Sequence, residues 1–320
     1  MRISNNMMIY NFLSSLNSSQ RRMNTFQEQL SDGKIVHRPS DDPVRAIRGL
    51  RLNTDLFTNE QYTQNASDGT AWLKQTDSTL TNLHEISQKA KELVIQAAGV
   101  NPAVSEAAIA EQIDGLINQA VTLANSQSGE RYIFAGQQDK VAGGPFKRMT
   151  INGTEYVVYS GDANKISMPI QPGAADPRRD SVNVTGGEVF GPLTTVQDTV
   201  TGQTYATATF FSDLLTIKNE LAKTAPDKNY LSGTALVNID RNLDRVLLAQ
   251  TQIGARMASY EMAQNMMEYD YVTIAENISA NDDLDIARAT IEFKNNENVY
   301  NAALAVGARI MPQSLVDFLR

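Results

Sequence analysis

Cysteine is absent from this chain of 320 residues, and only two histidines and one tryptophan occur. Without cysteine there are no disulfide bonds, no thiolate nucleophiles and no cysteine-ligated metal sites. No apolar run approaches the roughly 18 residues that a membrane-spanning helix needs. The net charge of −8 provides no basic field of the kind that attracts nucleic acid. These absences exclude disulfide-stabilised, thiol-dependent, membrane-spanning and nucleic-acid-binding classes of protein.

Residues that could carry chemistry are scattered and lack partners at useful spacing. His37 and His84 lie on different segments, and neither has a second histidine at metal-ligand spacing. The acids at 282–285 suit a helix start better than a calcium loop, because no glycine follows at the required position. Gly186 and Gly187 are not followed by the lysine of a phosphate loop. We therefore expect no catalytic site, no metal and no cofactor, and hence no enzyme.

Apolar residues recur every seven positions at both ends of the chain, with further ones such as Ile310 interleaved at steps of three and four. The positions that we expect to form an assembly interface are Ile9, Leu16, Met23, Leu30, Ile286, Phe293, Tyr300 and Ile310. This spacing places a narrow apolar stripe on one face of each helix, where another helix can cover it. Neither end encodes a core of its own. The sequence therefore predicts that the two terminal helices pair with each other and complete their packing against neighbouring molecules.

A break and a restart follow the first terminal helix. Gly33 is placed for a C-terminal cap. The segment expected to restart the helix and cap it is Pro39, Ser40, Asp41, Asp42 and Pro43. The side chain of Asp42 can accept hydrogen bonds from the first turn, and a proline at the first helical position loses no bond. This pair of acids therefore indicates helix capping rather than acid–base catalysis.

Two long helical regions are expected on either side of an insert. The first runs from Pro43 to about Ala98, with apolar or small residues at steps of three and four in its second half. A further helix begins near Ser105 and is expected to pack back on the first as an antiparallel hairpin. The longest stripe runs from Leu236 to Ile278 and predicts coiled-coil packing.

The insert between these helices is rich in glycine, threonine and valine. Asn152-Gly153 separates Met149–Ile151 from Tyr156–Tyr159, which predicts a hairpin with a two-residue turn. The segment Tyr132–Gly136 predicts a short strand that leaves the helical layer. The insert is therefore expected to form a small β-rich domain.

The predicted fold class is mainly α with a β-rich insert, in which the N- and C-terminal segments form a long helical bundle or coiled coil. We expect a terminal coiled-coil domain from residues 1–38 and 284–320. Residues 39–137 and 206–283 are expected to form a helical bundle, and residues 138–205 a β-rich outer domain. The first and last helices are thus expected to lie together.

Several short motifs resemble the flagellin superfamily of bacterial flagella. They are Met1–Ser4, Gly33-Lys34, Arg38–Pro43, Gln61-Tyr62, Trp72-Leu73, Arg131–Gly136, Val182–Gly186 and Phe318–Arg320. Within the superfamily the motifs are most similar to the hook–filament junction proteins. The likeness covers nearly the whole chain and is loosest in the insert.

The resemblance implies a structural subunit that self-assembles into a junction between hook and filament. Its implied partners are further copies of itself, the first hook–filament junction protein, flagellin, and an export chaperone at the C-terminal helix. The implied location is extracellular, on the flagellum, after export through the flagellar type III apparatus. No cleaved signal peptide is expected, because the short apolar run 7–10 ends at Asn11.

Other functions stay open. A flagellin-type filament subunit is the alternative within the superfamily, although flagellins usually carry a Lys-Asp-Asp type sequence where this chain has Arg38–Pro43. A coiled-coil signalling or receptor fragment would lack a membrane span and would not explain the β-rich insert. An enzyme housed in the insert would need convergent polar groups, and the sequence offers none that can be named.

Overall fold

The computed structural model describes residues 5–99, 105–138, 140–173 and 176–310. In chain order the elements are α1 (Asn5–Asp32), α2 (Pro43–Ala98), α3 (Glu106–Ala124), β1 (Gln127–Ser128), β2 (Arg131–Tyr132), β3 (Phe146–Ile151), β4 (Thr154–Tyr159), α4 (Pro177–Asp180), α5 (Gly186–Val189), β5 (Leu193–Gln197), β6 (Thr204–Ala208), α6 (Thr209–Leu221), α7 (Lys228–Tyr230), the π-helix η1 (Leu231–Ala235), α8 (Leu236–Asp282) and α9 (Ile286–Ile310). The fold is mainly α with a β-rich insert, which confirms the predicted class. None of the helices in the described ranges is both long and apolar enough to cross a membrane.

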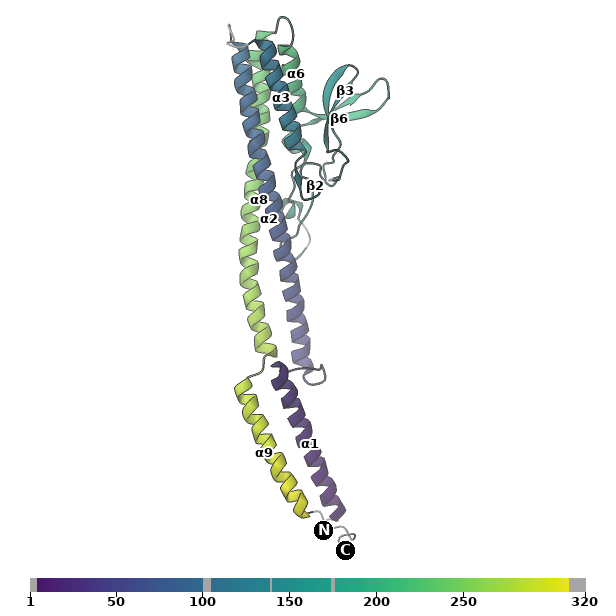
Figure 1. The fold of residues 1–320 in the computed structure, drawn as a ribbon, viewed down its shortest axis with the longest axis vertical. Coiled ribbons are helices and arrows are strands. Elements are labelled where there is room, and N and C mark those ends of the chain that lie inside the picture. The colour runs from purple at the N-terminus through teal and green to yellow at the C-terminus, as the bar shows by residue number, and fades with distance from the viewer. Residues whose placement is uncertain (1–4, 100–104, 139, 174–175, 311–320) are drawn as a thin grey trace. The chain divides into compact units, whose positions relative to one another are not determined.

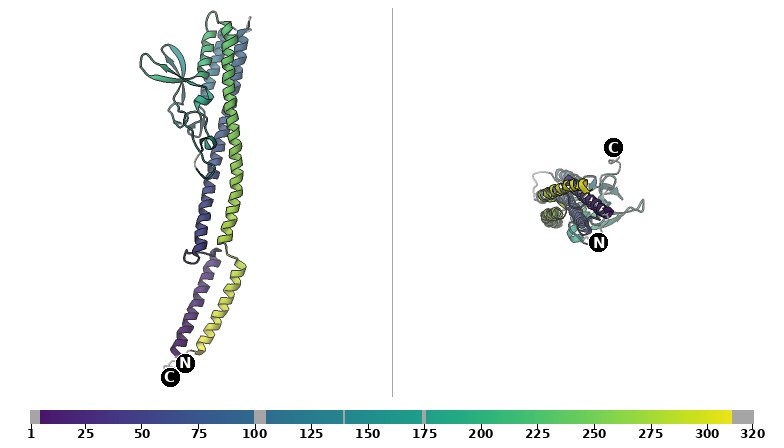
Figure 2. Two further views of the ribbon diagram at one scale, coloured as in Figure 1. Left: turned by 180° about the vertical axis from the view of Figure 1, so that it is seen from behind. Right: turned by 90° about the horizontal axis from the view of Figure 1, so that it is seen from below.

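The chain divides into two compact units. Unit 1 comprises Met1–Glu60 and Tyr269–Arg320, and unit 2 comprises Gln61–Glu268. In unit 1, α1 and α9 lie side by side as an antiparallel pair in both views (Figure 1, Figure 2). This confirms that the two terminal helices pair with each other. The three-part division with boundaries after residues 38, 137, 205 and 283 stays a prediction.

Two connectors in unit 1 are joined by backbone hydrogen bonds. The first helix ends at Gly33, whose φ of 74° is a conformation that glycine adopts without strain. The amide of Ile35 donates to the carbonyl of Asp282 at 2.8 Å, and the amide of Leu284 donates to the carbonyl of Gly33 at 2.8 Å. The ends of α1 and α8 are thereby tied to the start of α9.

Unit 2 is built around α2, α3, α6 and α8 (Figure 1). The helix expected over 43–98 is confirmed, and so is the long helix that contains 236–278. From Ile239 to Met267 every seventh residue of α8 is buried, as expected for a heptad stripe. These residues are Ile239, Val246, Ile253, Tyr260 and Met267. The next heptad position, Ile274, is half-buried, and Tyr271, four residues after Met267, is 46% exposed.

The insert contains a four-stranded antiparallel sheet in the order β3-β4-β6-β5, beside α3 and α6 (Figure 1). Asn152 and Gly153 have φ of 50° and 78°, the positive values of a two-residue hairpin turn. The predicted hairpin is therefore confirmed. A cluster of aromatic rings with centroids 4.8–5.6 Å apart forms the core of this region. Its members are Phe134, Phe146, Tyr159, Phe190, Phe210 and Phe211.

The strand expected over Tyr132–Gly136 is wrong beyond its first residue. The strand β2 ends at Tyr132, and the next residues form turns although Ile133, Phe134 and Ala135 are completely buried. Their backbone groups bond to separate segments rather than to one partner strand. The amide of Ile133 donates to the carbonyl of Ser126 at 3.1 Å, whereas the carbonyl of Phe134 accepts from Gly186 at 2.9 Å. Apolar residues alone therefore indicated burial, not strand pairing.

Candidate assembly surface

The apolar stripe of α1 faces α9 within the same chain. Along α1 the residues at steps of three and four are half-buried or buried; they are Ile9, Phe12, Leu16, Ser19, Met23, Phe26 and Leu30. The matching row on α9 is Ala289, Phe293, Asn296, Tyr300, Ala303 and Gly307. Each row covers the other, so the terminal helices form a two-helix coiled coil of heptad type.

The closest approach of the pair is at Phe12 and Gly307. A Cβ built on Gly307 would lie 2.4 Å from Cζ of Phe12, nearer than two non-bonded carbons can come. Gly307 is buried, and the aromatic ring occupies the space that its missing side chain leaves. This position of the α9 row therefore requires glycine for close packing rather than for backbone flexibility.

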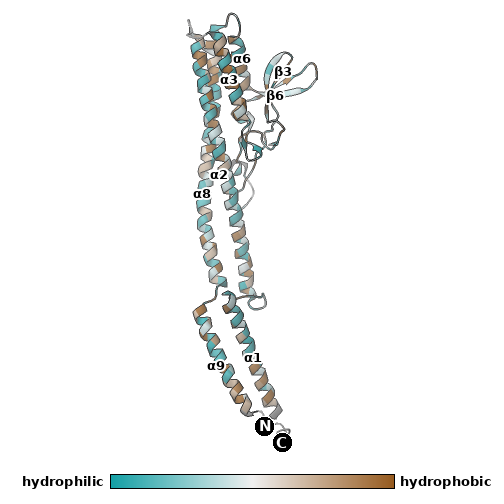
Figure 3. Cartoon of the chain, in the orientation of Figure 1, coloured by the Kyte–Doolittle hydropathy of each residue, from teal (hydrophilic) through white to brown (hydrophobic). Residues whose placement is uncertain are grey.

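A second set of apolar side chains in the pair faces outward. On α1 they include Tyr10, which is 75% exposed, and on α9 they include Ile291 and Val299, each 61% exposed. The remaining members are Met7, Met8, Leu13, Ile286, Leu304 and Val306. We call these nine residues the outer apolar set. Apolar residues accordingly recur along α1 and α9 in the hydropathy colouring (Figure 3). We therefore take α1 and α9 as the candidate interaction surface.

The predicted interface residues separate into groups in the structure. Ile9, Leu16, Met23, Leu30, Phe293 and Tyr300 are half-buried in the α1–α9 pair, whereas Ile286 is 61% exposed. The side chain of Ile310 lies outside the described residues. Sequence reasoning missed most of the outer apolar set because it followed only the heptad stripe. The available signal was the surplus of large apolar residues at the other heptad positions, such as Tyr10 and Val299.

The restart segment is held by its two acids. Oδ1 of Asp42 accepts from the amides of Val44 and Arg45, each at 3.0 Å, which is the geometry of an N-cap. The neighbouring Asp41 accepts from the amide of Arg38 at 3.0 Å and so closes the turn that contains Pro39 and Ser40. Both carboxylates thus accept hydrogen bonds from backbone amides. Pro43 occupies the first helical position.

The restart segment is also anchored to the end of α8. Nη1 of Arg45 donates to the carbonyl of Asn281 at 2.8 Å, and Nδ2 of Asn281 donates to the carbonyl of Arg45 at 3.0 Å. Asn281 is 3% exposed. This reciprocal pair of hydrogen bonds fixes the register of α2 against α8 in unit 1, because a shift would leave buried polar groups unpaired.

A charged cluster joins the insert to the helices of unit 2. Arg148 on β3 donates to Asp114 on α3 at 2.6 Å and to Glu155 on β4 at 2.7 Å. Lys218 on α6 donates to the same two carboxylates at 2.9 and 2.7 Å. The hydrogen bond from Arg148, together with that from Lys218, lowers the pKa of Asp114 to about 2 despite its partial burial. The cluster holds four elements together rather than forming a reactive site.

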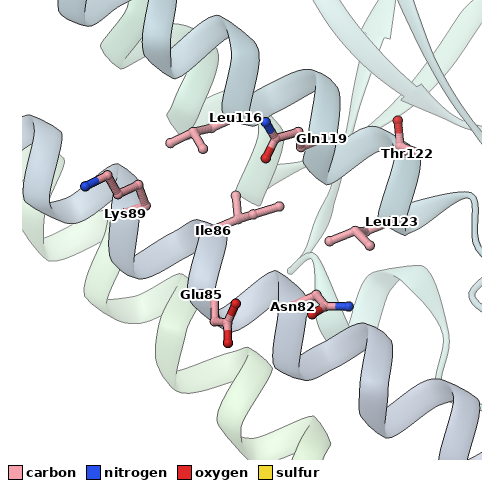
Figure 4. A pocket seen from close by; sticks show the side chains of 8 residues that line it. All are labelled: Asn82, Glu85, Ile86, Lys89, Leu116, Gln119, Thr122 and Leu123. Carbon is pink, nitrogen blue, oxygen red and sulfur yellow. The ribbon is translucent and has the colours of Figure 1, made fainter.

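An open cleft of about 620 Å³ lies between α2 and α3 (Figure 4). Its apolar lining is Ile86, Leu116 and Leu123. Polar side chains lie around them, from Asn82, Glu85, Lys89, Gln119 and Thr122. Lys89 lies beside Leu116, and Asn82 lies toward Leu123, so the two helices run antiparallel, as predicted. The lining of the cleft contains no histidine, cysteine or serine.

The two histidines lie in different units. His37 Nε2 is 2.6 Å from Oδ2 of Asp32 at the end of α1, and His84 lies beside Gln88 on α2. Across the described ranges no group of three or more histidines, cysteines or acids is placed to hold a metal ion.

Comparison with known proteins agrees with this picture. Residues 3–139 match the family described as the bacterial flagellin N-terminal helical region. The chain is 28% identical over 276 residues to flagellar hook-associated protein 3 of Escherichia coli, an alignment covering 83% of each chain. It is also 25% identical to flagellin of Bacillus subtilis, over 100% of both chains.

Two solved structures show the same fold. A flagellar hook-associated protein from Vibrio parahaemolyticus aligns with a TM-score of 0.61 at 18% identity, over 76% of this chain and 100% of that one. The flagellar junction protein FlgL of Legionella pneumophila aligns with a TM-score of 0.54 at 19% identity, over 74% of this chain and 100% of that one. At these identities the likeness concerns the fold alone.

Proposed function

We propose that this chain is a flagellin-superfamily protein of the hook-associated kind and that it joins the hook of a bacterial flagellum to its filament. The match of residues 3–139 to the flagellin N-terminal helical region and the likeness to flagellar hook-associated protein 3 support this proposal. The chain acts as a structural subunit that self-assembles into a junction. Its work is mechanical, and it needs neither a cofactor nor a catalytic group.

The observation that supports assembly is the outer apolar set of the terminal helices. Within α1 and α9 the stripes already cover each other, yet Tyr10, Ile291 and Val299 remain between 61% and 75% exposed. Covering each such side chain contributes about 1.5–3 kcal/mol. A lattice in which neighbouring copies cover these residues therefore gains stability in proportion to the number of contacts. The predicted stripe residues contribute indirectly, since they hold the pair together.

The remaining partners follow from the same proposal. The subunit contacts further copies of itself, the first hook–filament junction protein on the hook side and flagellin on the filament side. An export chaperone covers the C-terminal helix before the chain leaves through the flagellar type III apparatus without a cleaved signal. In the assembled junction the terminal segments form an inner tube, the helical bundle an outer tube, and the insert faces solvent.

Filament retention in a strain that lacks this chain tests the proposal directly. Loss of motility with hooks present and filaments shed into the medium is expected, and expression of the wild-type chain should restore both. A strain that keeps its filaments without this chain would remove the junction function.

Two matched substitutions test the surface itself. Val299→Ser on α9 is expected to reduce filament retention, because it removes apolar area that a neighbour covers. Val200→Ser, in an exposed turn of unit 2 where Val200 is 87% exposed, is the control and should retain filaments at the wild-type level. Equal retention by the two variants would contradict assembly through the outer apolar set.

A flagellin-type filament subunit is the second candidate, because the match to Bacillus subtilis flagellin spans the full length of both chains. The two functions predict different positions on the flagellum. Antibody labelling of a tagged chain should give one band at the hook end for a junction protein and continuous labelling along the filament for a flagellin.

A further inference from the structure

A second apolar face lies in unit 1, on the first four turns of α2. Val44, Ile47, Leu50 and Phe57 are each between 64% and 69% exposed. With about 3.6 residues per turn, these side chains lie opposite the side of α2 that faces α8. That inner side is marked by Gly49, where a Cβ would lie 3.2 Å from Oδ1 of Asp282.

Of the polar residues on this face, Thr54 and Thr58 turn their hydroxyls inward and Arg51 is basic, whereas the exposed acid Asp55 lies at its edge. Thr54 and Thr58 donate their hydroxyls to the carbonyls of Leu50 and Thr54, at 2.9 and 2.8 Å, which turns polar groups toward the helix backbone. Arg45, Arg48 and Arg51 occur between residues 43 and 54, a stretch with no acid. We call the surface formed by Val44, Ile47, Leu50, Arg51 and Phe57 the basic face.

The end of α8 in unit 1 carries the opposite charge. Tyr269 and Val272 are 77% and 50% exposed, and Glu276 on the same side of the helix is exposed as well. No lysine or arginine occurs from residue 257 to residue 287, whereas residues 269–287 contain Asp270, Glu276, Asp282, Asp283 and Asp285. We call the surface formed by Tyr269, Val272 and Glu276 the acidic face.

The two faces point away from each other. Asn281 on α8 bonds to Arg45 on α2, so the inner sides of the two helices meet and the exposed sides are directed outward. The basic and acidic faces therefore cannot meet within one copy. Between successive copies they can meet head to tail, and a contact between two different faces repeats from copy to copy in a ring or a helical array.

We propose that the basic face of one copy docks on the acidic face of a second copy, with Arg51 opposite Glu276 and the apolar residues of both faces packed between them. The inference rests on the proposed junction function, and it names a lateral contact separate from the outer apolar set. Opposite charges align the two faces and exclude face-to-face pairing of like surfaces, while the apolar residues stabilise the contact.

Cross-linking in assembled flagella tests the contact, because the natural chain has no cysteine to interfere. Flagella from a strain expressing the Ile47→Cys, Val272→Cys double variant are treated with a short bis-maleimide. A ladder of dimers, trimers and larger species is expected, since each copy presents both partners of the contact. The control pair Ile47→Cys, Tyr271→Cys places its second cysteine on another side of α8 and should give at least about tenfold less trimer.

A charge exchange tests the pairing independently. Arg51→Glu and Glu276→Arg should each lower filament retention at least about fivefold, since each brings like charges together. The chain carrying both exchanges should recover to within about twofold of wild type. Circular dichroism of each purified variant checks that the helices are intact.

The outcomes separate this contact from the junction function. Equal cross-linking of the two cysteine pairs in flagella that retain their filaments would overturn the docking of the two faces. So would a double charge exchange that retains no more filaments than the single exchanges. Either result would leave the junction function standing. Failure of the wild-type chain to restore filaments would overturn the junction function instead.

Discussion

Tyr260 on α8 packs its ring directly against Gly69 on α2. A Cβ built on Gly69 would lie 2.2 Å from Cε1 of the ring, and Tyr260 is completely buried. The hydroxyl of Tyr260 donates to the carbonyls of Met168 and Asp180, at 2.9 and 3.0 Å. The side chain of Tyr260 therefore connects the two long helices α2 and α8 to the part of the insert that contains Met168 and Asp180.

Replacing Gly69 by alanine should destabilise unit 2. The added methyl group overlaps a buried ring that is fixed by two hydrogen bonds, so we expect a loss of about 1–3 kcal/mol in the free energy of unfolding. Chemical denaturation followed by circular dichroism measures it. Gly254→Ala on α8 is the matched control, because nothing lies within 4 Å of its added Cβ. The free energy of unfolding of the Gly254→Ala variant should rise by up to about 1 kcal/mol. A Gly69→Ala variant as stable as the Gly254→Ala variant would refute the close contact.

Replacing Gly307 by valine should separate the terminal helices without affecting unit 2. The side chain would occupy the position of the Phe12 ring, which forces α9 away from α1. Faster amide hydrogen exchange in α1 is expected, with unchanged exchange in α3 and α6. Ala305→Val, at an exposed position of the same helix, provides the comparison. Similar exchange in both variants would mean that Phe12 does not pack on Gly307.

The stability of unit 2 should fall in acid through Asp114. Its carboxylate is ionised and bonded in the folded state, where its pKa is about 2, below the ordinary value of 3.8. Folding is therefore favoured above about pH 4, and this contribution is lost as the pH falls from about 4 toward 2. We expect about 1–2 kcal/mol from this group after solvent screening. Unfolding curves at several pH values measure it, and the Asp114→Asn variant should lose less stability on acidification than wild type.

The terminal helices of the isolated monomer should exchange amide hydrogens faster than unit 2. Their packing covers only one narrow stripe, so many of their side chains remain half-exposed, whereas Leu73 and Leu80 on α2 are completely buried. Removing 16 residues from either end of the 320 should leave unit 2 folded and abolish assembly. Strong protection of the amides before Leu30 in a dilute monomer would contradict this prediction.

Several local features were predictable because they depend on neighbours along the chain. The end of α1 at Gly33, the start of α2 at Pro43 and the hairpin at Asn152-Gly153 each follow from the conformational limits of one or two residues. The stripes of α1 and α9 were predictable for the same reason, since the helical period places these side chains on one face. The absence of disulfide bonds likewise follows from the absence of cysteine.

The sequence pattern did not predict, for every helical face, which element packs against it. A helical period states which residues share a side, but not which element covers that side. The pairing of α1 with α9 was predicted, but only the folded chain revealed that Tyr10 and Val299 are left outward and that Ile133 to Ala135 are buried in turns. Contacts such as Tyr260 on Gly69 join residues distant in sequence, and burial there depends on the positions of several elements at once, which no local pattern encodes.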